Sequence, residues 1–223
     1  MTNILFWALS TLGLVLGLVG MQGSVSGWAS SGTFKIAATT LFFFIGTSIP
    51  LSIGFTKSNF VMLLGLFFVL LGDFFLSYLG TTSVFLYGMI NFMLGYALLA
   101  ASAGLRTEWK SLGSTKKGFS VIIILCIFTA IGVSVFLNLD KIGDNTLPIL
   151  IYLIVQISLV SLSYASNNPW LIVGAIFLFI SDVIIALNLF SSRVSFGNLY
   201  QYLIMPTYYL GLASFIRGFY KKW

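Results

Sequence analysis

The chain has 223 residues, of which 59% are hydrophobic and 7% are charged, and its formal net charge is +6. A soluble domain carries about 25% charged residues to cover its surface, so this composition excludes a soluble protein and predicts an integral membrane protein. The chain has no histidine and one cysteine, Cys126. This excludes histidine general bases, Ser-His-Asp triads, histidine-ligated metals, CxxC redox motifs and intramolecular disulfides. We expect no metal and no cofactor.

A helix that crosses the hydrocarbon core of a bilayer needs about 20 mostly apolar residues. Eight such runs follow one another along the chain: Ile4–Gly20, Phe34–Gly54, Phe60–Leu79, Val84–Ala103, Phe119–Leu139, Leu147–Ala165, Pro169–Phe190 and Leu199–Ile216. The longest predicted links, Met21–Thr33 and Gly104–Gly118, are too short for a soluble domain. The sequence therefore predicts an all-α polytopic membrane protein with eight transmembrane helices, forming a single integral membrane domain over residues 1–223. A cleaved signal peptide is disfavoured, because no basic segment precedes the first run.

The basic residues predict the orientation. An even number of spans places both termini on one side, together with eight Lys and Arg residues: Lys57, Arg106, Lys110, Lys116, Lys117, Arg217, Lys221 and Lys222. The other side has three: Lys35, Lys141 and Arg193. Because positive charge is retained in the cytoplasm, we expect a multi-pass protein of the cell membrane with cytoplasmic termini. The positive charge is thus a topology signal, and no nucleic acid partner is expected.

Two segments 109 residues apart resemble each other. Asn59–Asp73 reads NFVMLLGLFFVLLGD and Asn168–Asp182 reads NPWLIVGAIFLFISD, and the ungapped alignment pairs Asn with Asn, Gly65 with Gly174 and Asp with Asp. The alternative is that any two apolar helices look alike. The pattern indicates two parallel repeats of four helices, with halves 1–110 and 111–223. Each aspartate would lie about 21 Å along its helix, past the middle of a core roughly 30 Å thick.

Asp73 and Asp182 are the candidate catalytic residues. A carboxylate in the hydrocarbon costs about 2.5–3.5 kcal/mol on insertion scales, so two of them in one small protein need a reason. One reason is a paired site in the interior of the bundle. The alternative is that each aspartate separately hydrogen-bonds a neighbouring helix.

Other polar side chains occur at helical spacing and are candidates for lining the same site. They are Lys35, Ser77, Tyr87, Asn91, Tyr152, Gln156 and Tyr208. Each is equally suited to join helices, because Ser, Asn and Gln commonly hydrogen-bond between membrane helices. Lys35 has two interpretations: an interfacial anchor or a phosphate-binding group.

Several motifs resemble the YhhN-like lysoplasmalogenase family of polytopic membrane proteins. They are LLGDFFLS (Leu70–Ser77), GxxxF (Gly88–Phe92), GAIFLFISD (Gly174–Asp182), the Tyr208-Tyr209 pair, Phe34-Lys35, and Tyr152 after Pro148. The resemblance extends from about Phe34 to Arg217. Three positions depart from the family pattern: Tyr96 stands where the family has histidine, Leu212 where it has glutamine or histidine, and Ile36 where it has proline. Tyr96 is kept as a candidate substrate-binding residue on this basis.

The resemblance implies an enzyme that hydrolyses the vinyl ether bond of a lysoplasmalogen to a fatty aldehyde and a glycerophospho-headgroup. Its substrate would be a lysophospholipid within the bilayer, and Asp73 and Asp182 would act as acid and carboxylate. Vinyl ethers open by proton transfer to carbon, and water captures the resulting oxocarbenium ion. The transition state of glycosidases, which also use two carboxyl groups, is likewise oxocarbenium-like. The residues leave two alternatives open: a proton- or cation-coupled transporter that uses the same aspartate pair, and a non-catalytic lipid-binding or scaffold protein.

Overall fold

The computed structural model describes residues 3–27, 31–78, 82–107, 146–190 and 199–220. The secondary structure of these segments is helical: α1 (Asn3–Val25), α2 (Ser31–Ile53), α3 (Lys57–Tyr78), α4 (Thr82–Gly104), α7 (Thr146–Ala165), α8 (Pro169–Phe190) and α9 (Leu199–Tyr220). Six of these, α1 to α4, α7 and α8, are long and apolar enough to cross a membrane. A helix satisfies its own backbone hydrogen bonds, which the hydrocarbon requires. The prediction of an all-α polytopic membrane protein is confirmed.

Seven of the eight predicted apolar runs coincide with these helices, and α8 begins and ends at the predicted residues. The predicted fifth run, Phe119–Leu139, and most of the predicted link Gly104–Gly118 lie outside the described residues. The link between the first two helices is shorter than the predicted Met21–Thr33, because α1 continues to Val25 and α2 already begins at Ser31. The reason is close packing: a Cβ on Gly20 would lie 2.9 Å from the Ser31 carbonyl oxygen. The glycine-rich end of α1 therefore stays helical against the start of α2.

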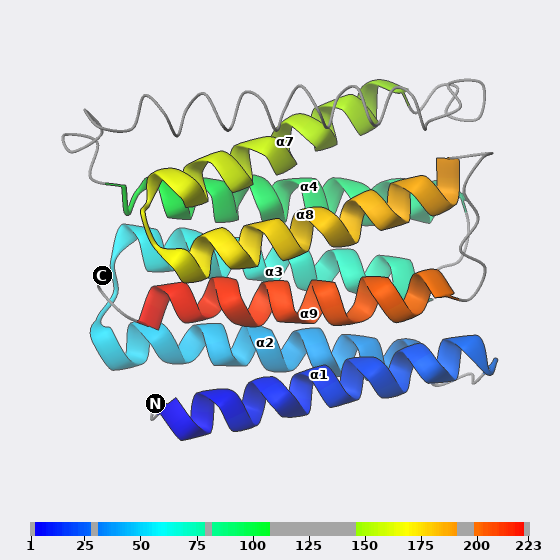
Figure 1. Ribbon diagram of the computed structural model, residues 1–223, viewed down its shortest axis with the longest axis horizontal. Coiled ribbons are helices and arrows are strands. Elements are labelled where there is room, and N and C mark those ends of the chain that lie inside the picture. The colour runs from blue at the N-terminus through cyan, green and yellow to red at the C-terminus, as the bar shows by residue number, and fades with distance from the viewer. Residues whose placement is uncertain (1–2, 28–30, 79–81, 108–145, 191–198, 221–223) are drawn as a thin grey trace.

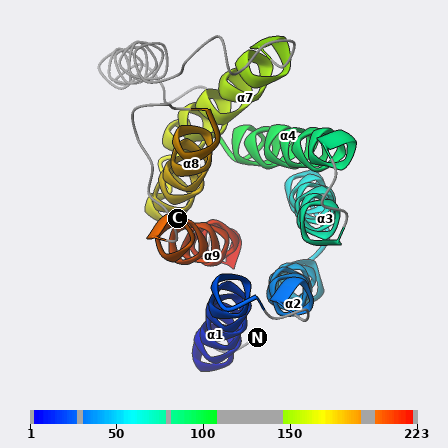
Figure 2. The same ribbon diagram turned by 90° about the vertical axis from the view of Figure 1, so that its right-hand side faces the viewer.

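The helices run alongside one another in Figure 1, and the end view in Figure 2 shows them arranged around a ring. Each described helix contacts the next one in the order α1, α2, α3, α4, α7, α8 and α9, and α9 contacts α1 and α2. The start of α1 and the end of α9 lie at the same end of the bundle (Figure 1). This end is called the terminal end below, and the other is called the distal end.

Two pairs of neighbouring helices are joined by the same arrangement of glycines. A Cβ on Gly65 of α3 would lie 3.0 Å from Leu99 of α4, and one on Gly95 of α4 would lie 2.7 Å from Val69. In the second pair, Gly174 of α8 faces Phe215 of α9, and Gly211 of α9 faces Leu178. Glycines let the backbones of membrane helices approach closely. These contacts fix how each aspartate-bearing helix is rotated about its axis.

The half of the bundle nearest the terminal end is tightly packed. Its fully buried apolar side chains come from all the described helices and include Met62, Leu99, Leu171, Phe215 and Phe219. The Gly218 carbonyl of α9 accepts hydrogen bonds from Asn168 at the start of α8 (2.8 Å) and from Arg106 just after α4 (3.0 Å). Three helix ends are thus joined at one carbonyl. Along α3 and α8 the buried apolar core ends at Val69 and Leu178, each one helical turn before an aspartate.

Candidate active site

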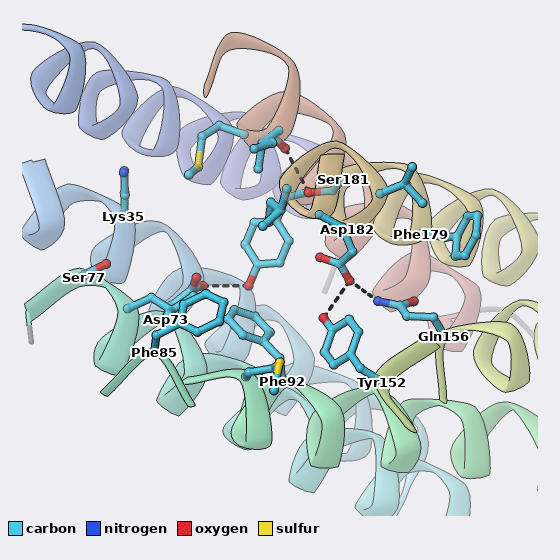
Figure 3. Close-up of a pocket in the computed structure, with 18 of the residues that line it drawn as sticks. Lys35, Asp73, Ser77, Phe85, Phe92, Tyr152, Gln156, Phe179, Ser181 and Asp182 are labelled. Carbon is cyan, nitrogen blue, oxygen red and sulfur yellow. Dashed lines mark hydrogen bonds between the residues drawn. The ribbon is translucent and has the colours of Figure 1, made fainter. Parts of the chain in front are cut away.

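Asp73 and Asp182 lie where the packed core ends. Both line one cavity of about 370 Å³ in the distal half of the bundle. Figure 3 shows Asp73 beside Lys35 and Ser77 on the left of the view, and Asp182 beside Tyr152 and Gln156 on the right. Pockets that bind small molecules have about this size or larger and combine apolar walls with a few polar groups. The two carboxyl groups therefore belong to one cavity, as the paired-site interpretation requires.

Asp182 is held by α7. The Tyr152 hydroxyl donates a 2.8 Å hydrogen bond to its Oδ2 atom, and the Gln156 side-chain amide donates a second one to the same oxygen. The two donors are four residues apart, so they stand one above the other on one face of α7. Both of these hydrogen bonds end on Oδ2, and the Tyr96 hydroxyl lies within electrostatic reach of the same carboxyl.

Asp73 is held by two helices from opposite ends of the chain. The Tyr208 hydroxyl of α9 donates a 2.7 Å hydrogen bond to Oδ2, and Thr39 of α2 donates another to the same atom. The Lys35 side chain, one turn before Thr39, interacts electrostatically with the Asp73 carboxyl. As at Asp182, both donors use a single oxygen. The two carboxyl groups are thus fixed in the same manner by different residues.

Five of the predicted binding residues line the cavity: Lys35, Ser77, Tyr152, Gln156 and Tyr208. Lys35 and Ser77 lie towards the distal end, together with Ser24 and Ser31. The apolar lining residues come from α3, α4, α7, α8 and α9, with Leu153, Phe179 and Val183 among them. The cavity therefore has a cluster of hydroxyl and ammonium groups on α1, α2 and α3, whereas the polar groups on α7 and α8 lie around Asp182 among apolar residues.

Three predicted binding residues do not line the cavity. The Tyr87 side chain is 58% exposed on the outside of α4, and the Asn91 amide is hydrogen-bonded to the Tyr87 carbonyl. Gly72 and Gly88 pack α3 against α4 and turn this face of α4 away from the interior. Tyr96 is completely buried behind the lining. Its ring packs against Phe92 and Tyr152, with centroids 5.9 and 6.1 Å away.

Tyr96 supports Asp182 from behind. It lies within electrostatic reach of the Asp182 carboxyl, and its ring packs against the tyrosine that binds this carboxyl. The hydroxyl makes no well-formed hydrogen bond with the described residues. Leu212, the other departure from the family pattern near the site, is fully buried in the core.

Sequence reasoning missed Thr39 and Phe92. Thr39 is buried and binds Asp73, and Phe92 lines the cavity beneath Gly72. One signal was available for Thr39, because it lies four residues after Lys35 and so shares its helix face.

The described residues contain no group of three or more His, Cys, Asp or Glu side chains arranged to hold a metal ion. The chemistry of the cavity therefore has to be derived from its carboxyl, phenol, amide, hydroxyl and ammonium groups.

Comparison with curated proteins and with solved structures finds no significant match. The model of the YhhN family matches residues 28–219, which is most of the chain and includes both aspartates and every described residue that lines the cavity except Ser24. The chain belongs to the YhhN family.

Proposed function

We propose that this protein is an intramembrane hydrolase that cleaves the vinyl ether bond of lysoplasmalogens to a fatty aldehyde and a glycerophospho-headgroup. One observation carries the proposal: Asp73 and Asp182 line a single cavity that has hydroxyl and ammonium groups on α1 to α3 and apolar side chains from the other helices, including α7 and α8. Family membership supports the same reaction class. A lysophospholipid has this distribution of polar and apolar parts, and its ether bond lies between them.

The chemistry needs one carboxylic acid and one carboxylate. The acid protonates the second carbon of the vinyl ether, and the double-bond electrons form the new C–H bond. The positive charge is then shared between the first carbon and the ether oxygen. The carboxylate stabilises this oxocarbenium ion and takes a proton from the water that attacks the first carbon. The resulting hemiacetal collapses to the aldehyde and the glycerol hydroxyl, and one water molecule is consumed overall.

The neighbours of the aspartates suit these roles. Tyr152 and Gln156 fix Asp182, and Thr39 and Tyr208 fix Asp73, each through the Oδ2 atom. Oriented groups of this kind lower the cost of reaching the transition state because they need no rearrangement during the reaction. The remaining oxygen of each carboxyl is the one that donates a proton to carbon or activates water.

The proposed protein has eight membrane spans in two parallel four-helix halves, and both termini lie in the cytoplasm. The equivalent glycine contacts of the α3–α4 and α8–α9 pairs support the repeat. In these pairs Gly95-Tyr96 corresponds to Gly211-Leu212, so two of the three departures from the family pattern occupy equivalent positions. With cytoplasmic termini, the distal end and the polar part of the cavity face the outer side of the membrane.

The decisive experiment measures aldehyde release from a lysoplasmalogen by the purified protein in detergent. We expect release by the unaltered protein and a large loss in Asp73→Asn and Asp182→Asn. A coupled transporter would release no aldehyde, and the same substitutions would instead abolish ion-driven flux in proteoliposomes. The packed terminal half of the bundle favours the hydrolase, because it closes the described part of the cavity below the aspartates. Absence of aldehyde release from several vinyl ether lipids would overturn the proposal.

A further inference from the structure

The polar end of the cavity gathers side chains from three helices. Ser24 of α1, Ser31 and Lys35 of α2, and Ser77 of α3 all line it. Two glycines bring these helices together: a Cβ on Gly20 would lie 3.0 Å from Lys35 Cγ, and one on Gly32 would lie 3.0 Å from the Ser77 carbonyl oxygen. The hydroxyl and ammonium groups are thus placed in one part of the cavity by backbone packing.

Lys35 is the cation of this cluster. It is half-buried, and within the described part of the chain its ammonium group forms neither an ion pair nor a hydrogen bond. The hydroxyls of Ser24, Ser31 and Ser77 likewise have no hydrogen-bond partner among the described residues. One ammonium group and three hydroxyls supply up to six N–H and O–H donors, which is the chemistry that binds a phosphate. The Asp73 carboxyl lies nearby but does not use these donors.

The spacing between this cluster and the aspartates is about one helical turn. Lys35 precedes Thr39, the partner of Asp73, by four residues, and Ser77 follows Asp73 by four residues. Both are displaced towards the distal end by about 6 Å along their helices. The three-carbon glycerol of a phospholipid spans a comparable length between its phosphate and the oxygen at its first carbon. A phosphate held here would therefore place an ether at that carbon beside the carboxyl groups.

The cavity also offers apolar side chains to a hydrocarbon chain. They include Leu153 of α7 and Phe179 and Val183 of α8. A volume of about 370 Å³ is near the lower end of the usual range for ligand sites, which favours a single-chain lipid over one with two chains. The polar cluster thus suits the phosphate, the carboxyl groups one helical turn away suit the ether bond, and the apolar residues suit the chain.

We propose that Lys35, together with Ser31 and Ser77, forms a subsite for the phosphate of a single-chain lysophospholipid and thereby positions the ether bond at Asp73 and Asp182. This subsite rests on the proposed function. Lys35 is a binding residue, and the serine hydroxyls donate to the remaining phosphate oxygens.

The test compares Lys35→Gln with the unaltered protein on two substrates, a lysoplasmalogen and a 1-alkenylglycerol that has the same ether but no phosphate. For the lysoplasmalogen we expect KM to rise about 10- to 100-fold, the range for losing a hydrogen bond to a charged group. For the 1-alkenylglycerol we expect no change. Lys35→Arg should retain most of the affinity. Lys57→Gln is the matched control, because Lys57 is exposed at the terminal end of α3.

A binding measurement separates this inference from the proposed reaction. A saturated 1-alkyl lysophospholipid cannot be cleaved, and its binding should be weakened by Lys35→Gln, whereas binding of the matching 1-alkylglycerol should not. Inorganic phosphate and a water-soluble glycerophosphodiester should compete only weakly, because they lack the chain. If inorganic phosphate bound as tightly as the 1-alkyl lysophospholipid, the proposal that the phosphate belongs to a lipid would be wrong.

The two proposals fail in different ways. If no vinyl ether is cleaved but alkyl lysophospholipid binding depends on Lys35, the reaction is wrong and the subsite stands. If aldehyde is released and Lys35→Gln affects both substrates equally, or neither, the subsite is wrong and the reaction stands. If Lys35 only anchors α2 at the interface, Lys35→Gln would lower the thermal stability of the protein and would affect both substrates alike.

Discussion

Tyr208 on α9 donates a 2.7 Å hydrogen bond to Asp73 on α3, across a sequence separation of 135 residues. Together with Thr39 on α2, it fixes one oxygen of the carboxyl group at the floor of the cavity. Tyr152 and Gln156 do the same for Asp182 from α7. Each carboxyl is thus held by helices other than its own, and its orientation depends on the packing of the whole ring.

The two aspartates should be required for the same step. In Asp73→Asn and Asp182→Asn we expect kcat for aldehyde release to fall about 10²–10⁴-fold each, because the amide keeps the size but removes the acid or the carboxylate. The double variant should be little slower than either single one, since groups that act together are not additive. Asn91→Ala is the control, because Asn91 lies outside the cavity. Full activity in both single variants would reject this site.

The tyrosines that bind the aspartates should contribute less than the aspartates themselves. In Tyr152→Phe and Tyr208→Phe we expect kcat/KM to fall about 10-fold or more, the effect of removing one hydrogen bond to a carboxylate. Tyr87→Phe is the matched control and should have unaltered kinetics, because Tyr87 is exposed on the outside of α4. Equal effects of all three substitutions would show that the contacts to the aspartates do not matter.

Gly174 should be essential for packing α8 against α9. A Cβ at this position would lie 2.5 Å from the Phe215 backbone nitrogen, which cannot move without shifting α9. We expect Gly174→Ala to destabilise the protein by about 1–3 kcal/mol, as overpacking does, and to lower Tm in detergent. At Gly104 the nearest atom, on the Leu162 side chain, is 3.5 Å away, so Gly104→Ala should leave Tm unchanged or raise it. A Tm for Gly174→Ala equal to that of the unaltered protein would contradict the close approach of α8 and α9.

The distal end of the bundle should face the outside of the cell. Reporter fusions after Lys117 and after Trp223 should both indicate the cytoplasm. In a Cys126→Ser background, an impermeant thiol reagent should label Ser24→Cys in intact cells, because Ser24 lines the polar part of the cavity. Ser52→Cys, exposed near the terminal end, should react only after permeabilisation. The reverse labelling pattern would invert the proposed orientation and place the cavity on the cytoplasmic side.

The sequence alone determined the fold class, the bounds of the described helices to within a few residues, and the two acidic residues of the cavity. Apolar runs of about 20 residues leave few alternatives to membrane helices, and a carboxylate inside such a run is rare enough to indicate a site. The i, i+4 spacing of Tyr152 and Gln156 places both side chains on one face, because both residues belong to the same helix and its geometry relates them.

Only the tertiary structure decided which polar residues meet. A soluble helix shows its buried face by its apolar stripe, but a membrane helix is apolar towards lipid and towards its neighbours alike. Phe42 is 1% exposed and Phe44 is 61% exposed, although both are phenylalanines in the same apolar run. For the same reason, Tyr87 and Asn91 had the spacing of a cavity lining but lie outside it, and Thr39 was missed. Rotation of each helix about its own axis is set by close contacts such as those at Gly65 and Gly174, which join residues far apart in the sequence.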